Sequence, residues 1–274
     1  MDLMEAKQIL SLMGGAIPSG QWSQELTTAV QRALAELYLL NPHDDVDGVI
    51  GLRTRGAWGY FKEATNQADP DTIESESVDL LLQALDNPVG LIGQAKITLQ
   101  PEFAFRRRQG QANREQSAQA IIAAAKTQQL TTAQIAYILA TAEHESDSFN
   151  TLEEYARGNQ YEGRNDLGNT QAGDGPRFKG RGYVQLTGRR NYMRYTEITG
   201  IELVKLPIIL MNWPALSVFV IVDGMMRGVY TERRLGEFVN SSQADFFNAR
   251  QVVNDHDCAQ KIADHANDWI KQLT

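Results

Sequence analysis

Two glutamates and a threonine have the residue types and the spacing for acid–base chemistry on a sugar polymer. Glu145 and Glu154 are nine residues apart, and Thr187 follows Glu154 by thirty-three residues. Hydrolysis of a glycosidic bond uses two carboxyl groups, one to protonate the leaving oxygen and one to activate a water molecule. The pair therefore indicates a glycosidase site.

Glu145, the first of the two acids, is the last residue of a helical pattern over residues 130–145. Apolar residues recur on its face at three- and four-residue steps, at Ile135, Ile138 and Ala142, so Glu145 belongs to the stripe that faces the core. A carboxylate rarely lies there for stability. Loss of hydration should raise its pKa and keep the proton that a general acid donates. Thr131 and Gln134 have the spacing of a capping box at the start of this helix.

The segment before Thr187 has two parts. Residues 158–176 contain five glycines among many Asn and Asp residues, which predicts a mobile loop over a cleft. Alternation over residues 183–187 predicts a short extended segment with one face toward a sugar and the other buried. The sugar-facing side chains are expected to be Tyr183, Gln185 and Thr187, and the buried ones Val184 and Leu186.

The triplet His144-Glu145-Ser146, the second acid and the run Gly180 to Thr187 resemble the family 19 chitinases and the phage and bacterial endolysins related to them. The resemblance covers about residues 111–274. It implies a lysozyme-like α-helical domain in which Glu145 is the acid and Glu154 the base of an inverting reaction. The carboxylates should then be ~6.5 to 9.5 Å apart, which leaves room for the water. No cofactor and no metal ion are implied.

The resemblance also implies that Thr187 and Gln185 hold the catalytic water and the sugar, with further sugar contacts at His144, Asn191 and Asn254 beside the Tyr183 expected above. Tyr183 stands where the plant chitinases have proline, a departure shared with the endolysin-like branch, and this favours peptidoglycan over chitin. Muramic acid carries a lactyl carboxylate, so a cation beside the sugar is expected, from Lys179, Arg189 or Arg190. A chitinase remains the alternative within this chemistry, and a non-catalytic wall-binding protein is the alternative from another class.

Several assignments stay open at this level. Glu153 could replace Glu154 as the base, and Glu162 is a third candidate. Glu145 could instead be a buried ion-pair partner of Arg181 or Arg189. A zinc-binding His-Glu-x-x-His helix is disfavoured, because Ser148 occupies the second histidine position.

The bulk properties limit the classes of function. A formal charge of −8 argues against nucleic-acid binding, and the only cysteine, Cys258, excludes an internal disulfide framework. The apolar stretch of residues 206–222 contains Asn212 and Pro214 and is too short for a convincing membrane span, so no membrane insertion is expected. The N-terminus shows no signal-peptide pattern. We expect a monomer that is made in the cytoplasm and acts on the wall, in the periplasm or outside the cell.

Three zones are predicted along a mainly α chain of 274 residues. Residues 1–68 have helical patterns at 3–13, 23–40 and 53–64, and the run from Asp47 to Thr54 resembles the signature of small three-helix peptidoglycan-binding modules; a plain helix-loop-helix would explain the same residues. Residues 69–110 are predicted as a partly helical connector. Residues 111–274 are the predicted catalytic domain.

Overall fold

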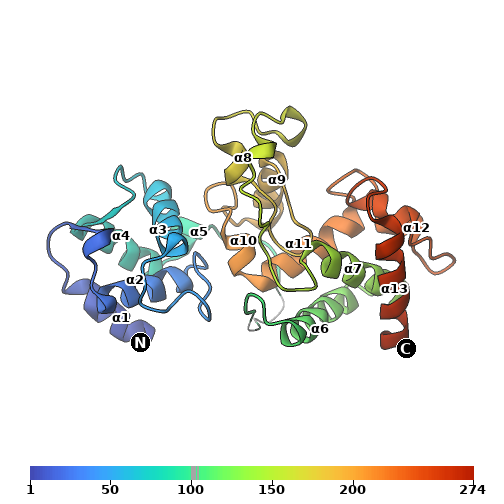
Figure 1. Cartoon of the computed structure of the whole chain (residues 1–274), viewed down its shortest axis with the longest axis horizontal. Helices are drawn as coiled ribbons and strands as arrows, with labels where there is room; N and C mark the ends of the chain where they lie inside the picture. The colour runs from blue at the N-terminus through green and yellow to red at the C-terminus, as the bar shows by residue number, and fades with distance from the viewer. Residues whose placement is uncertain (100–102, 104) are drawn as a thin grey trace. The chain divides into compact units, whose positions relative to one another are not determined.

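The chain is mainly helical, as its sequence predicts. The computed structural model describes residues 1–99, 103 and 105–274 (Figure 1). In this described part the only sheet is a two-stranded antiparallel one, formed by β1 (Ile17–Pro18) and β2 (Thr72–Ile73). The chain divides into two compact units, Met1–Ile97 with Met193–Asn212, and Thr98–Tyr192 with Trp213–Thr274.

The first unit is built on four longer helices. Asp2 and Ser23 cap the first two through side-chain oxygens that accept from backbone N–H groups, and Trp58 and Phe61 stack in the core. The second helix ends four residues earlier than predicted, and the left-handed Tyr38 follows it. The elements are α1 (Leu3–Ser11), α2 (Gln24–Glu36), α3 (Leu52–Ala64), α4 (Ser75–Asp86), the short α5 (Val89–Ile92) and α10 (Ile209–Asn212), with a 3₁₀ turn η1 (Ser19–Gln21).

The first unit extends well beyond the predicted boundary at residue 68. β2 pairs with β1 and carries the buried Ile73, so residues that were predicted to connect two domains complete this one. The buried ammonium of Lys62 donates to the Ser77 hydroxyl at 2.8 Å and to the Thr72 carbonyl at 3.2 Å. These bonds tie α4 to α3. Of the predicted connector, residues 100–102 and 104 lie outside the described residues.

The run from Asp47 to Thr54 has a clear local role. The buried Gln31 amide donates to the Asp47 carboxylate, the Val49 carbonyl and the Thr54 hydroxyl, and its oxygen accepts from the backbone N–H groups of Asp47 and Gly48. Gly48 has φ +74°, and a Cβ there would lie 2.8 Å from the Gln24 side chain. The motif residues therefore hold a turn between α2 and α3.

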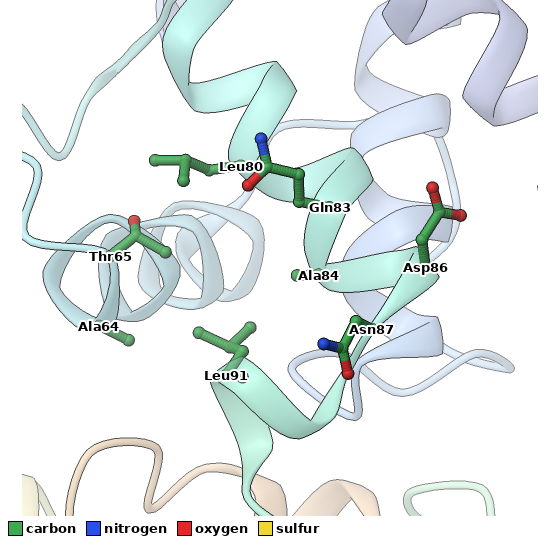
Figure 2. A pocket seen from close by; sticks show the side chains of 9 residues that line it. Ala64, Thr65, Leu80, Gln83, Ala84, Asp86, Asn87 and Leu91 are labelled. Atoms are coloured by element: carbon green, nitrogen blue, oxygen red, sulfur yellow. The ribbon is translucent and has the colours of Figure 1, made fainter.

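A concave pocket of about 590 Å³ opens on the first unit (Figure 2). It lies where the C-terminal ends of α3 and α4 meet α5. Asp86 at its rim forms an ion pair of 2.6 Å with Lys7. A Cβ added to Gly90 would meet no atom within 4 Å, so the backbone at this position borders open space. The lining residues are Ala64, Thr65, Leu80, Gln83, Ala84, Asp86, Asn87, Gly90 and Leu91.

The second unit packs α7 (Thr132–Glu145) against α13 (Ala259–Leu273) and α6 (Gln111–Thr127) (Figure 1). The predicted capping box of Thr131 and Gln134 is confirmed at the start of α7. No helix in the described residues is long and apolar enough to span a bilayer. The remaining elements are α8 (Asp174–Arg177), α9 (Arg189–Thr199, within which the division of the units falls), α11 (Pro214–Arg227), α12 (Leu235–Phe238) and the 3₁₀ turns η2 (Asn159–Tyr161), η3 (Asn165–Leu167) and η4 (Asn248–Val252).

The end of α7 is abrupt and sets the position of Glu145. Asp147, Ser148 and Phe149 follow it with φ values of 50°, 57° and 65°, in the left-handed region that side chains disfavour. Phe149 is fully buried, and the N–H groups of Asn150 and Thr151 both donate to the Ser146 carbonyl. The chain therefore turns sharply directly after the predicted acid.

Candidate active site

A cleft of about 450 Å³ in the second unit brings most of the predicted catalytic residues together. Glu145 enters it from the last turn of α7, Glu154 from the segment after the left-handed turn, and Thr187 from the residues before α9. The full lining is His144, Glu145, Asp147, Thr151, Glu153, Glu154, Tyr155, Tyr161, Gly180, Gln185 and Thr187. Four of the predicted sugar contacts are outside this lining: Tyr183, Asn191, Asn254 and Arg189.

Glu145 is paired with an arginine that the sequence did not suggest. Arg250 Nη1 lies 2.6 Å from Glu145 Oε1, and the side chains are 3% and 17% exposed. Arg250 is itself held by a bond from its Nε to the Asp257 carbonyl. Among the described residues, no hydrogen-bond donor occupies the second oxygen of Glu145. The predicted ion-pair alternative is thus correct in kind, whereas the predicted partners Arg181 and Arg189 are wrong.

Glu154 accepts three hydrogen bonds. Gln160 Nε2 and the Tyr161 hydroxyl donate to its Oε1 at 2.8 and 3.1 Å, and the Gly180 N–H donates to its Oε2 at 3.1 Å. An ionised carboxylate only accepts hydrogen bonds, so this set of donors suits the charged form. Gly180 has no room for a side chain, because a Cβ would lie 2.7 Å from Gln185 Oε1 and 3.3 Å from Glu154 Oε2.

Glu153 faces two cations in place of open solvent. Its Oε1 lies 3.3 Å from both Lys179 Nζ and Arg181 Nε, and Arg181 is only 3% exposed. Arg181 also donates to the Arg177 carbonyl and the Tyr192 hydroxyl. Although Glu153 also lines the cleft, its carboxylate serves to compensate buried positive charge. This difference in partners separates the two adjacent glutamates.

The predicted extended segment over residues 183–187 is wrong. Arg181 and Leu186 bond to each other through their backbones and close a tight loop, in which Gly182 and Gln185 have φ values of 77° and 52°. Tyr183 consequently points into the core: it is fully buried, and its hydroxyl lies 2.7 Å from Ser117 Oγ. Burial raises the pKa of Tyr183 above its ordinary range. It cannot contact a sugar in this structure.

Gln185 and Thr187 remain in the cleft. The Gln185 amide donates to the Gly182 carbonyl, and the Thr187 hydroxyl donates to the Gln185 carbonyl at 2.8 Å. Asn191 lies one turn into α9, where its amide donates to the Thr187 carbonyl at 2.9 Å. Asn191 therefore helps to fix the backbone of Thr187. Asn254 is exposed, and its side chain accepts from the Asp255 N–H.

The predicted cations for a lactyl carboxylate are engaged elsewhere. Arg189 forms a two-bond pair with the buried carboxylate of Asp174 and lies over the Phe178 ring at 4.7 Å, which stabilises the loop after η3. Lys179 is paired with Glu153. Among the described residues that line the cleft, none is a lysine or an arginine. Glu162, the third candidate acid, accepts from the Gly173 and Gly175 N–H groups and so fastens the same loop.

His144, a predicted sugar contact, lines the cleft beside Glu145, and its surroundings favour the neutral form. Burial lowers the pKa of His144 from its ordinary 6.5; the nearby Glu145 carboxylate opposes this, and Arg250 adds to it. Its Nδ1 is buried and has no hydrogen-bond partner among the described residues. A neutral imidazole can offer a sugar hydroxyl either a donor or an acceptor.

The shifted histidine predicts a pH dependence of stability. Because the folded state disfavours the protonated form, the unfolded chain takes up the proton first, and stability is lost as pH falls through about 6.5. His144→Gln should remove this part of the loss, at most about 1.4 kcal/mol per pH unit. Urea unfolding at pH 7.5 and 5.5 measures it, with the exposed His43→Gln as control. Equal pH dependence in His144→Gln and the unaltered chain would contradict it.

Two functional neighbours were missed by the sequence reasoning. Arg250 is 105 residues from Glu145, and no local pattern marks it. Tyr161 lies in the glycine-rich loop, and its hydroxyl donates to Glu154. Burial raises the pKa of Tyr161, and the Glu154 carboxylate adds to this. The only sequence feature that marks Tyr161 is that it is an aromatic residue within an otherwise polar segment.

A scan of the chain against models of known protein families finds no match. The geometry of the cleft is therefore the basis on which its chemistry is judged.

Proposed function

We propose that the second unit is a glycoside hydrolase that cleaves β-1,4 bonds in the glycan strands of peptidoglycan by an inverting mechanism, on a lysozyme-like helical domain. The observation that carries the proposal is the pairing of Glu145 with Glu154 in one cleft. The two carboxylates come from separate segments and have different partners, a single arginine on one and three hydrogen-bond donors on the other. Two acids with different surroundings suit two different roles.

In the proposed reaction the water oxygen attacks the anomeric carbon while the glycosidic bond breaks. Glu145 gives its proton to the leaving oxygen, and Glu154 takes a proton from the attacking water. The Thr187 hydroxyl donates to the Gln185 carbonyl, so its oxygen is available to accept a hydrogen bond from that water. Arg250 holds Glu145 through Oε1 and so leaves Oε2 as the oxygen that acts on the leaving group in the proposed reaction.

Chitin is the second candidate substrate, and a specific observation favours it. The cleft carries four carboxylates and, among its described lining residues, no basic side chain that could select an anionic sugar. A neutral polymer of N-acetylglucosamine suits such a surface. Comparison of the rates on purified peptidoglycan and on soluble chitin oligomers decides between them, and a faster rate on chitin would replace peptidoglycan as the substrate.

The proposed activity is tested by mass spectrometry of digested peptidoglycan. New reducing ends on muramic acid or on glucosamine are expected, and their identity shows which bond is cut. No new reducing ends on either polymer, from a chain that still binds the wall, would favour the non-catalytic wall-binding protein. Such an outcome would remove the catalytic roles of Glu145 and Glu154.

We also propose that the first unit binds the wall through the pocket of Figure 2. Gly90→Phe should place an aromatic side chain at this pocket, because Gly90 lines it and an added Cβ there meets no atom within 4 Å. Binding to insoluble peptidoglycan should fall roughly tenfold, as for loss of one good binding site, while hydrolysis of soluble oligomers stays unchanged.

Gly56→Phe is the matched control, since Gly56 is an exposed position of α3 where an added Cβ also meets no atom within 4 Å. A pull-down with insoluble peptidoglycan gives both affinities. If Gly90→Phe and Gly56→Phe bind equally well, the pocket has no part in wall binding.

A further inference from the structure

Tyr155 is the most exposed aromatic side chain at the candidate cleft. It directly follows Glu154 and lines the same cleft, and 62% of its surface is accessible. An aromatic ring buries a large apolar area on binding, and tyrosine combines that area with few rotatable bonds. The exposure of this ring beside the proposed base is not explained by packing within the chain.

The ring is held in place even though it is exposed. Its hydroxyl donates to Asp147 Oδ2 at 2.9 Å, and the Arg108 guanidinium lies 5.7 Å from the ring centroid. The backbone beside it is also fixed, because the Glu154 N–H donates to the Gly180 carbonyl at 2.9 Å. A side chain that is fixed before binding loses little conformational entropy when a ligand arrives.

We propose that Tyr155 is the stacking surface for one neutral amino-sugar ring of the bound glycan. This inference rests on the proposed function and adds a subsite to it. A pyranose presents C–H groups on its faces and hydroxyl and amide N–H donors at its edge. Tyr155 offers the apolar face, and the carboxylates of Asp147, Glu145 and Glu154 around it offer acceptors to the donors.

The arrangement selects the class of ligand. Two of the four cleft carboxylates, Glu145 and Glu153, are paired with cations, whereas among the described residues Asp147 and Glu154 accept only from neutral donors. These two negative charges, against the single Arg108 guanidinium over the ring, favour an uncharged N-acetylated sugar as the occupant of the Tyr155 subsite. Because Glu154 is the preceding residue and lines the same cleft, a ring on Tyr155 lies close to the proposed base. The stacking contact exists both before and during the reaction, so its loss should raise KM with little change in kcat.

Binding is measured with the full chain carrying Glu145→Gln, so that the probe, a soluble N-acetylglucosamine oligomer, is not consumed. Isothermal titration should show affinity roughly tenfold or more weaker after Tyr155→Ala, the scale of an aromatic binding hot spot. Tyr155→Phe removes the bond to Asp147 but keeps the ring, and it should retain most of the affinity. Phe247→Ala, at an aromatic residue of the same unit that is 43% exposed and lies outside the cleft lining, is the control.

The outcomes separate this subsite from the proposed activity. If the unaltered chain hydrolyses glycans and Tyr155→Ala binds and turns over oligomers normally, the subsite is wrong and the activity stands. If no hydrolysis is found but Tyr155→Ala still abolishes oligomer binding, the activity fails and the subsite stands. Equal weakening by Tyr155→Phe and Tyr155→Ala, or no oligomer binding by the Glu145→Gln parent, overturns the inference.

Discussion

Replacing Glu145 by glutamine is expected to lower the rate of glycan hydrolysis on the order of 10²-fold or more, the usual scale for loss of a general acid. The amide has nearly the same shape as the acid but cannot donate the proton. Its oxygen can still accept from Arg250, which is only 3% exposed, so the fold should be retained with a modest loss of stability. Initial rates of dye release from labelled peptidoglycan, together with thermal melting, measure both effects.

Glu143→Gln is the matched control, two residues earlier on the same helix. The Glu143 carboxylate accepts from Arg114 Nε and from Trp269 Nε1, contacts that join α7 to α6 and α13, and it lies outside the cleft lining. Its loss should lower stability and leave the rate per folded molecule unchanged. Near-normal turnover by Glu145→Gln, or an equal loss by Glu143→Gln, would remove Glu145 from the role of acid.

The two adjacent glutamates should respond in opposite ways. Glu154→Ala is expected to reduce turnover by about 10² to 10⁴-fold with little loss of stability, because its carboxylate is the proposed proton acceptor. Glu153→Ala leaves Arg181 buried without its counter-charge and should cost about 2 kcal/mol of unfolding free energy. This is less than for a fully buried pair, because Glu153 is 22% exposed.

Each variant therefore serves as the control for the other, and urea unfolding is paired with rates on the same preparations. The assignment requires the rate loss to follow Glu154 and the stability loss to follow Glu153. If turnover per folded molecule falls mainly in Glu153→Ala, the base has been placed one residue too far along the chain.

Local patterns predicted the helices well, because helix formation depends on nearby residues. The three- and four-residue periodicity placed α7, and the Thr131 and Gln134 spacing placed its first turn. Glu145 and Glu154, assigned from the family resemblance and their nine-residue separation, both line one cleft, as does Glu153. Both inferences rest on contacts within about a dozen residues of chain.

Contacts between distant residues were not predictable in the same way. The partner of Glu145 is 105 residues away, and Arg189 is paired with a buried aspartate that has no sequence pattern of its own. The alternation over residues 183–187 was misleading because a period of two describes side chains only on an extended backbone. With Gly182 and Gln185 in the left-handed region, the same alternation buries Tyr183.

The domain boundary was missed for a related reason. β1 and β2 are two residues long each, too short for a strand pattern to be recognised, and yet their pairing joins residues 72–73 to the first unit. The sequence predicts a partly helical connector over residues 69–110, whereas β2 and α4 belong to the first unit. The buried Lys62, whose ammonium bonds to Ser77 and Thr72, shows that polar residues there serve internal contacts.

The left-handed turn at Asp147, Ser148 and Phe149 limits how many residues can separate Glu145 from Glu154. Glu145 ends helix α7, and Phe149 is buried in the core, so only residues 150–153 remain to bring Glu154 into the same cleft. A residue inserted or deleted between Glu145 and Glu154 would displace Phe149 from the core or turn the Glu154 carboxylate away from its three hydrogen-bond donors. The loop of residues 158–176 is longer, and of its described residues only Gln160 and Tyr161 bond to one of the two acids. The short segment of residues 146–153 thus determines the distance between the two carboxyl groups.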